Sequence, residues 1–156
     1  MQTTLNPNAQ AWVDALRSGD YKRGQSALHE MTGSERDEPL FCCLGVACDL
    51  FAKAHPDQGR WIATSPIPHG AFMFETATSR SQMHLTIEVS DWLGLKRQGP
   101  LASEGNDYGE FERAELDYET DLAIMQTLAT LNDEKDFSFK QIADVIESQP
   151  KGLFNA

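Results

Sequence analysis

The sequence has little positive charge. Its 13 Lys and Arg residues are outnumbered by 24 Asp and Glu residues, and the formal net charge at pH 7 is -11. Nucleic-acid phosphates and anionic lipid surfaces repel such a protein over a Debye length of about 8 Å at physiological ionic strength. We therefore expect neither direct nucleic-acid binding nor binding to a membrane. Three basic residues nevertheless lie close together in the sequence, at Arg17, Lys22 and Arg23.

The sequence also lacks a long apolar segment. No apolar run approaches the roughly 20 residues of a membrane-spanning helix. The N-terminal stretch "MQTTLNPNAQ" does not have the basic region and apolar region of a signal peptide. These observations predict a soluble, cytoplasmic protein. Its 156 residues are enough for a single domain, 1–156, with one core.

Cysteine is scarce and confined to one short stretch. The chain has three cysteines, Cys42, Cys43 and Cys48. An odd number of cysteines in a reducing compartment argues against a disulfide framework. Adjacent residues on a helix diverge by about 100°, so Cys42 and Cys43 cannot easily face one metal ion. We expect no metal site and no cofactor.

Helix signals dominate the sequence. A cap at Asn6 and a stop at Gly19 predict a helix between them. Residues 40–54 have apolar side chains on every face until Asp49, which predicts a buried central helix. Free cysteines pack in such a helix as small apolar residues, and Gly45 would admit a close neighbour. Further helices are expected over 86–94, 118–131 and 138–148.

Strand signals are limited to one region. Short alternation in residues 61–63 and 72–76, separated by a stretch with two prolines and a glycine, predicts a β-hairpin. Residues 95–116 are polar and acidic, and we expect them to form a surface loop. The predicted fold class is mainly α (α+β): a single compact helical domain around a buried Cys-rich central helix, with a small β-hairpin.

The cysteines leave an enzymatic alternative open. Cys42 or Cys43 would lie near the N-terminal end of the predicted helix, where the helix dipole favours a thiolate, and His69 could be its base. A cysteine at a helix start, a histidine on a strand and a later polar residue, such as Asn132 or Asp133, form an arrangement used by papain-like hydrolases. "CLGV" is also loosely similar to the "C-S-G-L" of small cell-wall amidases in that class. The competing interpretation is a buried, inert thiol.

The acidic region leaves a third possibility. If residues 110–121 were helical, their carboxylates would approach the density of phosphates along one DNA strand. The protein would then act as a DNA-mimic inhibitor.

Five segments together carry a family resemblance. In this order, "WVDALRSGDYKRG", "FCCLGVACDLF", "VSDWLGL", "LND" and "FSFKQIADVIE" resemble a family of small uncharacterised proteins of bacteriophages and bacteria. Arg23 departs from the glutamine that is usual in this family. The matching residues are Trp12, Arg17, Gly19, Tyr21, Gly24, Cys42, Cys43, Leu44, Gly45, Asp49, Trp92, Leu93, Gly94, Leu95, Asn132 and Asp133.

The resemblance implies a role inside a bacterial host. We expect a non-enzymatic phage protein that sequesters a small anionic, nucleotide-like ligand of the host, such as an immune signal, or that blocks a host protein. Arg17, Tyr21 and Lys22 would supply charge and stacking for a phosphate-bearing ligand. Asn132 and Asp133 would bind its polar edge. The sequence leaves homo-oligomerisation open.

Overall fold

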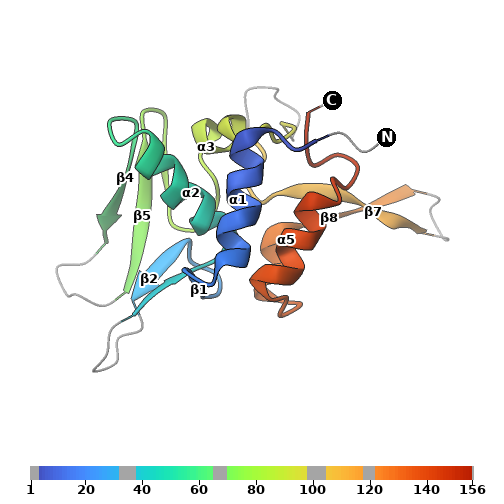
Figure 1. Ribbon diagram of the computed structural model, residues 1–156, viewed down its shortest axis with the longest axis horizontal. Helices are drawn as coiled ribbons and strands as arrows, with labels where there is room; N and C mark the ends of the chain where they lie inside the picture. The colour runs from blue at the N-terminus through green and yellow to red at the C-terminus, as the bar shows by residue number, and fades with distance from the viewer. Residues whose placement is uncertain (1–3, 32–37, 65–69, 98–104, 118–121, 156) are drawn as a thin grey trace.

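The fold combines helices with a mixed sheet. The computed structural model describes residues 4–31, 38–64, 70–97, 105–117 and 122–155 (Figure 1). The described helices are α1 (Pro7–Ser18), α2 (Cys43–Ala54), α3 (Ile87–Trp92), α4 (Leu128–Asp133) and α5 (Phe139–Glu147). The described strands are β1 (Lys22–Arg23), β2 (His29–Met31), β3 (Pro39–Phe41), β4 (Gly59–Ala63), β5 (Gly70–Thr76), β6 (Arg80–Ser81), β7 (Glu110–Asp117) and β8 (Leu122–Thr127).

The larger sheet corrects the predicted fold class. Six of the described strands form one sheet in the order β1-β3-β2-β5-β4, with β6 paired to β5. β1 and β3 are parallel and the other pairs are antiparallel. The protein is therefore α+β, and the prediction of a mainly helical domain is wrong. The expected hairpin is present as β4 and β5, but β1, β2, β3 and β6 span two or three residues each, too few to show a periodic pattern.

The first helix begins and ends where the sequence indicates. Asn6 caps α1, because its Oδ1 accepts a hydrogen bond from the backbone N–H of Ala9 at 2.9 Å. Gly19 ends the helix with φ of 82°, a conformation that glycine adopts at little cost. On the buried face, Trp12 donates its indole N–H to the carbonyl oxygen of Cys43 at 2.9 Å. This bond joins α1 to the start of α2.

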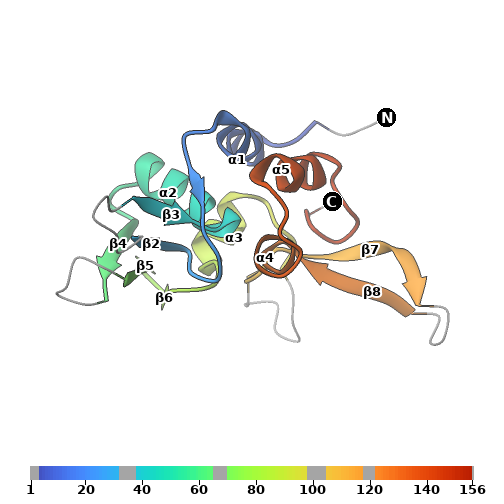
Figure 2. The ribbon, with the colours of Figure 1, turned by 90° about the horizontal axis from the view of Figure 1, so that it is seen from below.

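Helix α2 lies at the centre of the core, between α1 and the larger sheet (Figures 1 and 2). It begins at Cys43, because Pro39–Phe41 belongs to β3. The expected close neighbour of Gly45 is the backbone of Leu28: a Cβ at Gly45 would lie 1.7 Å from the Leu28 carbonyl oxygen. The residues from Cys43 to Cys48 are all buried. The prediction of a buried, Cys-rich central helix is therefore confirmed for this part of the chain.

Residues 110–127 differ most from expectation. β7 and β8 form a separate two-stranded antiparallel sheet, and only residues from Leu128 onward are helical. The predicted helix over 118–131 is thus wrong for 122–127, and residues 118–121 lie outside the described part. The predicted loop over 95–116 is wrong for the residues from Glu110 onward, and Leu95 and Asn106 in that range are buried. Strand pairing overrides the weak helical spacing of the apolar residues here.

Two consequences concern function. Because residues 110–117 form a strand, the helical array of carboxylates on which DNA mimicry depended is not present there. In the described part of the chain, no helix combines the length and the apolar character that a membrane span requires.

Candidate functional site

Asp49 is the centre of a polar cluster at the edge of the core. It lies on α2, and its carboxylate is 15 % exposed. Tyr21, between α1 and β1, donates its hydroxyl to Asp49 Oδ2 at 2.6 Å. Trp61 on β4 donates its indole N–H to Asp49 Oδ1 at 3.1 Å. Lys53, one helical turn after Asp49, places its Nζ 3.0 Å from Oδ2. Three separate elements of the chain therefore meet at one carboxylate.

The cluster holds Asp49 in its ionised form. Burial alone would raise the pKa of Asp49, but the hydrogen bonds from Tyr21, Lys53 and Trp61 outweigh burial and lower it. The pKa of Tyr21 is raised, chiefly by burial and also by its bond to Asp49. The pKa of Lys53 is raised by its hydrogen bond to Asp49. At neutral pH the cluster consists of a carboxylate, a neutral phenol and an ammonium group.

A hollow of about 580 Å³ opens beside this cluster, and we call it the Asp49 hollow. Its walls carry three carboxylates and one ammonium group, so its formal charge is negative. Among the described residues, the carboxylate of Asp20 has no hydrogen-bond or ion-pair partner. The aromatic wall is formed by Tyr21 and Phe41, whose ring centroids are 5.1 Å apart in an edge-to-face arrangement. The lining residues are Asp14, Ala15, Ser18, Asp20, Tyr21, Pro39, Phe41, Asp49, Leu50 and Lys53.

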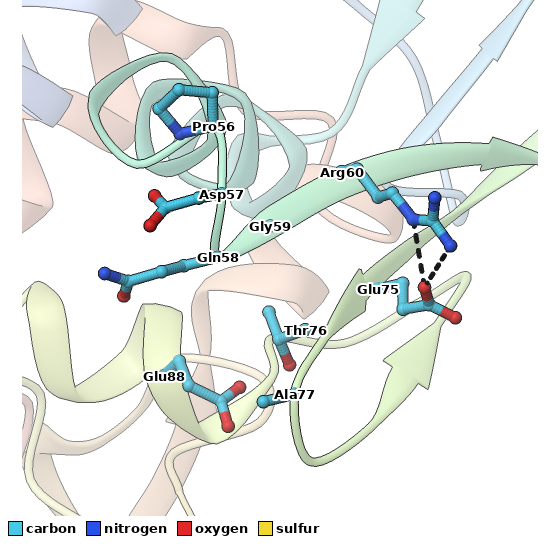
Figure 3. Close-up of a pocket in the computed structure, with 9 residues that line it drawn as sticks. All are labelled: Pro56, Asp57, Gln58, Gly59, Arg60, Glu75, Thr76, Ala77 and Glu88. Atoms are coloured by element: carbon cyan, nitrogen blue, oxygen red, sulfur yellow. Dashed lines mark hydrogen bonds and ion pairs between the residues drawn. The ribbon is translucent and has the colours of Figure 1, made fainter.

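A second hollow, of about 450 Å³, lies between the start of β4 and α3 (Figure 3). Arg60 and Glu75 pair at its edge, with guanidinium nitrogens 3.0 and 2.8 Å from Glu75 Oε1. Glu88 accepts a hydrogen bond from Thr78 through Oε1, whereas its Oε2 is shielded from solvent and has no partner in the described part of the chain. None of the described lining residues of this Glu88 hollow is aromatic. Unlike the Asp49 hollow, it therefore offers a ligand no described aromatic ring to stack on.

The cysteines do not reach either hollow. Cys42, Cys43 and Cys48 are 3 %, 0 % and 0 % exposed. Burial raises the pKa of Cys42 to about 12, and it raises the pKa values of Cys43 and Cys48 well above the ordinary thiol value. The Cys42 sulfur instead caps α2, 3.4 Å from the backbone nitrogen of Gly45. His69, the base of the hydrolase hypothesis, lies outside the described residues.

The structure separates the residues expected to bind an anion. Arg17 bridges α1 to α5 through ion pairs with Asp144 at 2.7 Å and Glu147 at 2.6 Å. The hydrogen bonds to these two carboxylates raise the pKa of Arg17. Lys22 pairs with Glu38. Tyr21 lines the Asp49 hollow, whereas neither Arg17 nor Lys22 is among its lining residues.

Asn132 and Asp133 lie near the N-terminal end of α2 and connect backbone segments. Asn132 is fully buried: its Oδ1 accepts from the Cys43 backbone N–H at 3.2 Å, and its Nδ2 donates to the Gly24 carbonyl at 2.9 Å. The carboxylate of Asp133 accepts from the backbone N–H of Ser26 at 2.8 Å. These bonds tie α4 to α2 and to the segment after β1. The two residues are not in the lining of the Asp49 hollow.

Two important members of the site were not among the predicted binding residues. Asp49 is one of the residues that match the family, but the sequence predicted no binding role for it. The sequence predicted none for Lys53 either. The sequence does contain a signal, because Asp49 is the first charged residue of an apolar helix and Lys53 follows it by four positions. Trp61 could not be connected to them, because its position depends on the pairing of β4 with β5.

Comparisons with known proteins give a family but no activity. A family model described as "Domain of unknown function (DUF8296)" matches residues 6–150. Neither the curated proteins nor the solved structures contain a match. In the described part of the chain, no group of three or more His, Cys, Asp or Glu side chains is arranged to hold a metal ion.

Proposed function

This chain belongs to the DUF8296 family, a domain of unknown function, and we propose that it is a non-enzymatic protein that binds a small organic cation in the Asp49 hollow. The observation that carries the proposal is the charge of this hollow. Asp14, Asp20 and Asp49 line the hollow together with a single ammonium group, that of Lys53, which pairs with Asp49. The whole chain adds to the effect, because its net charge of -11 attracts cations and repels anions.

The aromatic wall supports a cationic ligand as well. The ammonium group of Lys53 already lies 5.4 Å from the centroid of the Tyr21 ring, within the range of a cation–π contact. Lys53 is largely exposed, but its ammonium group is bonded to Asp49 and to the Tyr21 hydroxyl, so a ligand cation must displace it from this position. A planar ligand cation could then contact Tyr21 while its N–H groups face Asp20. This arrangement combines stacking with charge-assisted hydrogen bonds.

The state of the thiols favours binding over hydrolysis. A cysteine nucleophile acts as the thiolate and must reach its substrate. Cys42 and Cys43 are buried, and their pKa values are raised. These thiols are therefore poorly suited to act as the nucleophile of a hydrolase.

The expected anionic ligand receives less support from the geometry. Arg17 and Lys22 are each engaged by carboxylates, so a phosphate group would have to displace Glu147, Asp144 or Glu38. An amino-substituted planar ring in the Asp49 hollow would displace only the exposed ammonium group of Lys53. In the bacteriophage setting that the resemblance suggests, tight binding of such a host compound would sequester it.

The test is isothermal titration with two probes of equal size and opposite charge. Benzamidine and benzoate have the same ring, but benzamidine is a planar cation and benzoate an anion. We expect benzamidine to bind and to raise the melting temperature, and benzoate to do neither. Mass analysis of a panel of amines and nucleotides after incubation should return each compound intact.

Asp20→Asn tests where the probe binds. A charge about 4 Å away contributes ~1 kcal/mol in water, so this substitution should weaken benzamidine binding about fivefold. Asp57→Asn is the matched control, because Asp57 is an exposed acid that lines the Glu88 hollow. Equal binding of benzoate, or an unchanged affinity in Asp20→Asn, would contradict the proposal. Conversion of any compound would make the protein an enzyme.

A further inference from the structure

The hairpin of β7 and β8 projects from the body of the protein. In both views it extends away from the six-stranded sheet, beyond α4 and α5 (Figures 1 and 2). The pairing runs from Glu110 opposite Thr127 to Asp117 opposite Leu122. A two-stranded ribbon in water is marginally stable by itself and normally needs further strands or a packed face. Among the described residues, no third strand pairs with this hairpin, although Phe111 at its base belongs to the core.

The two edges of this hairpin differ. The outer edge of β7 is occupied near its base, where the backbone N–H of Glu112 donates to the carbonyl oxygen of Lys151 at 2.7 Å. On the outer edge of β8, no other described strand pairs with residues 122–127. An unpaired edge carries a row of N–H and C=O groups that are ready to pair with another strand.

The sequence of β8 lacks the residue types that commonly protect an edge strand. "LAIMQT" contains no charged residue, no proline and no glycine. Edge strands are commonly protected by lysine, proline or inward-facing charges. A continuous apolar run is typical of a strand inside a sheet, with neighbours on both sides. By composition, β8 is an interior strand, although in the single chain it lies at an edge.

We propose that β8 pairs antiparallel with β8 of a second copy, forming a four-stranded sheet across a two-fold axis. In such a dimer each β8 becomes an interior strand. A two-fold axis makes one surface complementary to itself, so identical edges are sufficient partners. The proposed dimer is independent of the ligand proposed for the Asp49 hollow.

The charges of the two strands favour pairing of two copies through β8 rather than through β7. β7, "EFERAELD", carries four acids and one arginine. Pairing through β7 would bring the acids of two copies within about 5 Å of each other across one strand spacing. Pairing through β8 leaves the two β7 strands three spacings apart, about 14 Å, which exceeds the Debye length of about 8 Å. In this arrangement the strongly acidic chain associates through an uncharged strand.

Sedimentation velocity of the full chain tests the dimer. We expect a species of twice 17.4 kDa that grows with protein concentration. Raising the salt concentration should favour it, because screening weakens the repulsion between two chains of charge -11. Ile124→Lys, which adds a charge to the open edge, should shift the protein to monomer. Ala114→Lys, the same type of change in β7, should leave the dimer in place.

A melting curve of each variant separates loss of pairing from loss of folding. Hydrogen exchange of wild type gives a second readout: amides of 122–127 should exchange more slowly at high protein concentration than at low concentration. Monomer at every concentration and salt tested would overturn the proposal. A dimer that resists Ile124→Lys, or that Ala114→Lys dissociates, would overturn it as well.

Discussion

The two halves of helix α2 have opposite roles. In the first half, up to Cys48, every residue is buried, and the backbone of Cys43 bonds to the Trp12 indole and to the Asn132 amide. The second half begins at Asp49, which contacts Tyr21 and Trp61 and borders a hollow. The potentially reactive cysteines lie in the buried first half, and the more exposed second half carries the charged residues Asp49 and Lys53. Burial, rather than the chemical nature of a side chain, decides which half can meet a ligand.

The largest expected effect concerns the first half. Gly45→Ala places a Cβ 1.7 Å from the carbonyl oxygen of Leu28, and because that atom belongs to the backbone, the two segments must move apart. We expect the free energy of unfolding to fall by about 3 kcal/mol or more. Urea denaturation followed by circular dichroism measures it.

Gly19→Ala is the control for Gly45→Ala. Gly19 has φ of 82° and no atom within 4 Å of an added Cβ, so only backbone strain of about 1–2 kcal/mol is expected. Equal losses in the two variants would show that α2 is not held by close backbone contact.

A smaller loss is expected where α4 meets the first half of α2. Asn132→Ala leaves the Cys43 N–H and the Gly24 carbonyl without their partner. Each unsatisfied buried group costs about 1–3 kcal/mol, so we expect a total near ~2–3 kcal/mol after relaxation. Asp133→Ala removes bonds from the Ser26 backbone N–H and from the Asn132 amide, but it leaves the bonds of Asn132 to Cys43 and Gly24 in place and should cost only about 1 kcal/mol. If both variants lose the same stability, Asn132 has no special role in the core.

The smallest expected effect belongs to the second half and depends on pH. The pKa of Asp49 is lowered in the folded protein, so its bonds stabilise the fold above the ordinary carboxyl pKa, and this stabilisation is lost as pH falls through the lowered value. Tyr21→Phe removes one of the bonds that lower this pKa. We expect a loss of about 1 kcal/mol at pH 7 and an acid transition that begins at a higher pH than in wild type.

Acid titration of both proteins by tryptophan fluorescence checks this prediction, since Trp61 is bonded to Asp49. In Asp49→Asn, the acid transition should contain no contribution from a carboxyl group at position 49. If the acid transitions of wild type and Tyr21→Phe coincide, the Tyr21 bond does not stabilise the ionised carboxylate.

Local signals accounted for the helices that have strong caps. Asn6 and Gly19 bound α1, and Ser138 with Gln141 forms a capping box at α5. In both cases the signal consists of residues within a few positions of the helix end, so no distant contact is needed. The same reasoning failed for residues 122–127, because a short apolar run is compatible with helix or strand until its partner is known.

The candidate site was less accessible to prediction. Tyr21, which was predicted to stack on a ligand, lines the Asp49 hollow, but the basic residues near it in sequence pair with carboxylates elsewhere. That Arg17 and Lys22 lie close together in the sequence does not show which carboxylate each side chain will pair with in the fold. Arg17 reaches α5, which lies more than a hundred residues later in the chain.

By itself, the sequence determined the net charge, the ends of α1 and α5 and the burial of the three cysteines. These properties follow from composition and from residues close together in the chain. Only the tertiary structure decided that Asp49 bonds to Tyr21, Lys53 and Trp61, that Arg17 pairs with two carboxylates of α5, and that no described strand pairs with the outer edge of β8. Those outcomes depend on contacts between distant segments, and their positions are set by the packing of the whole core around α2.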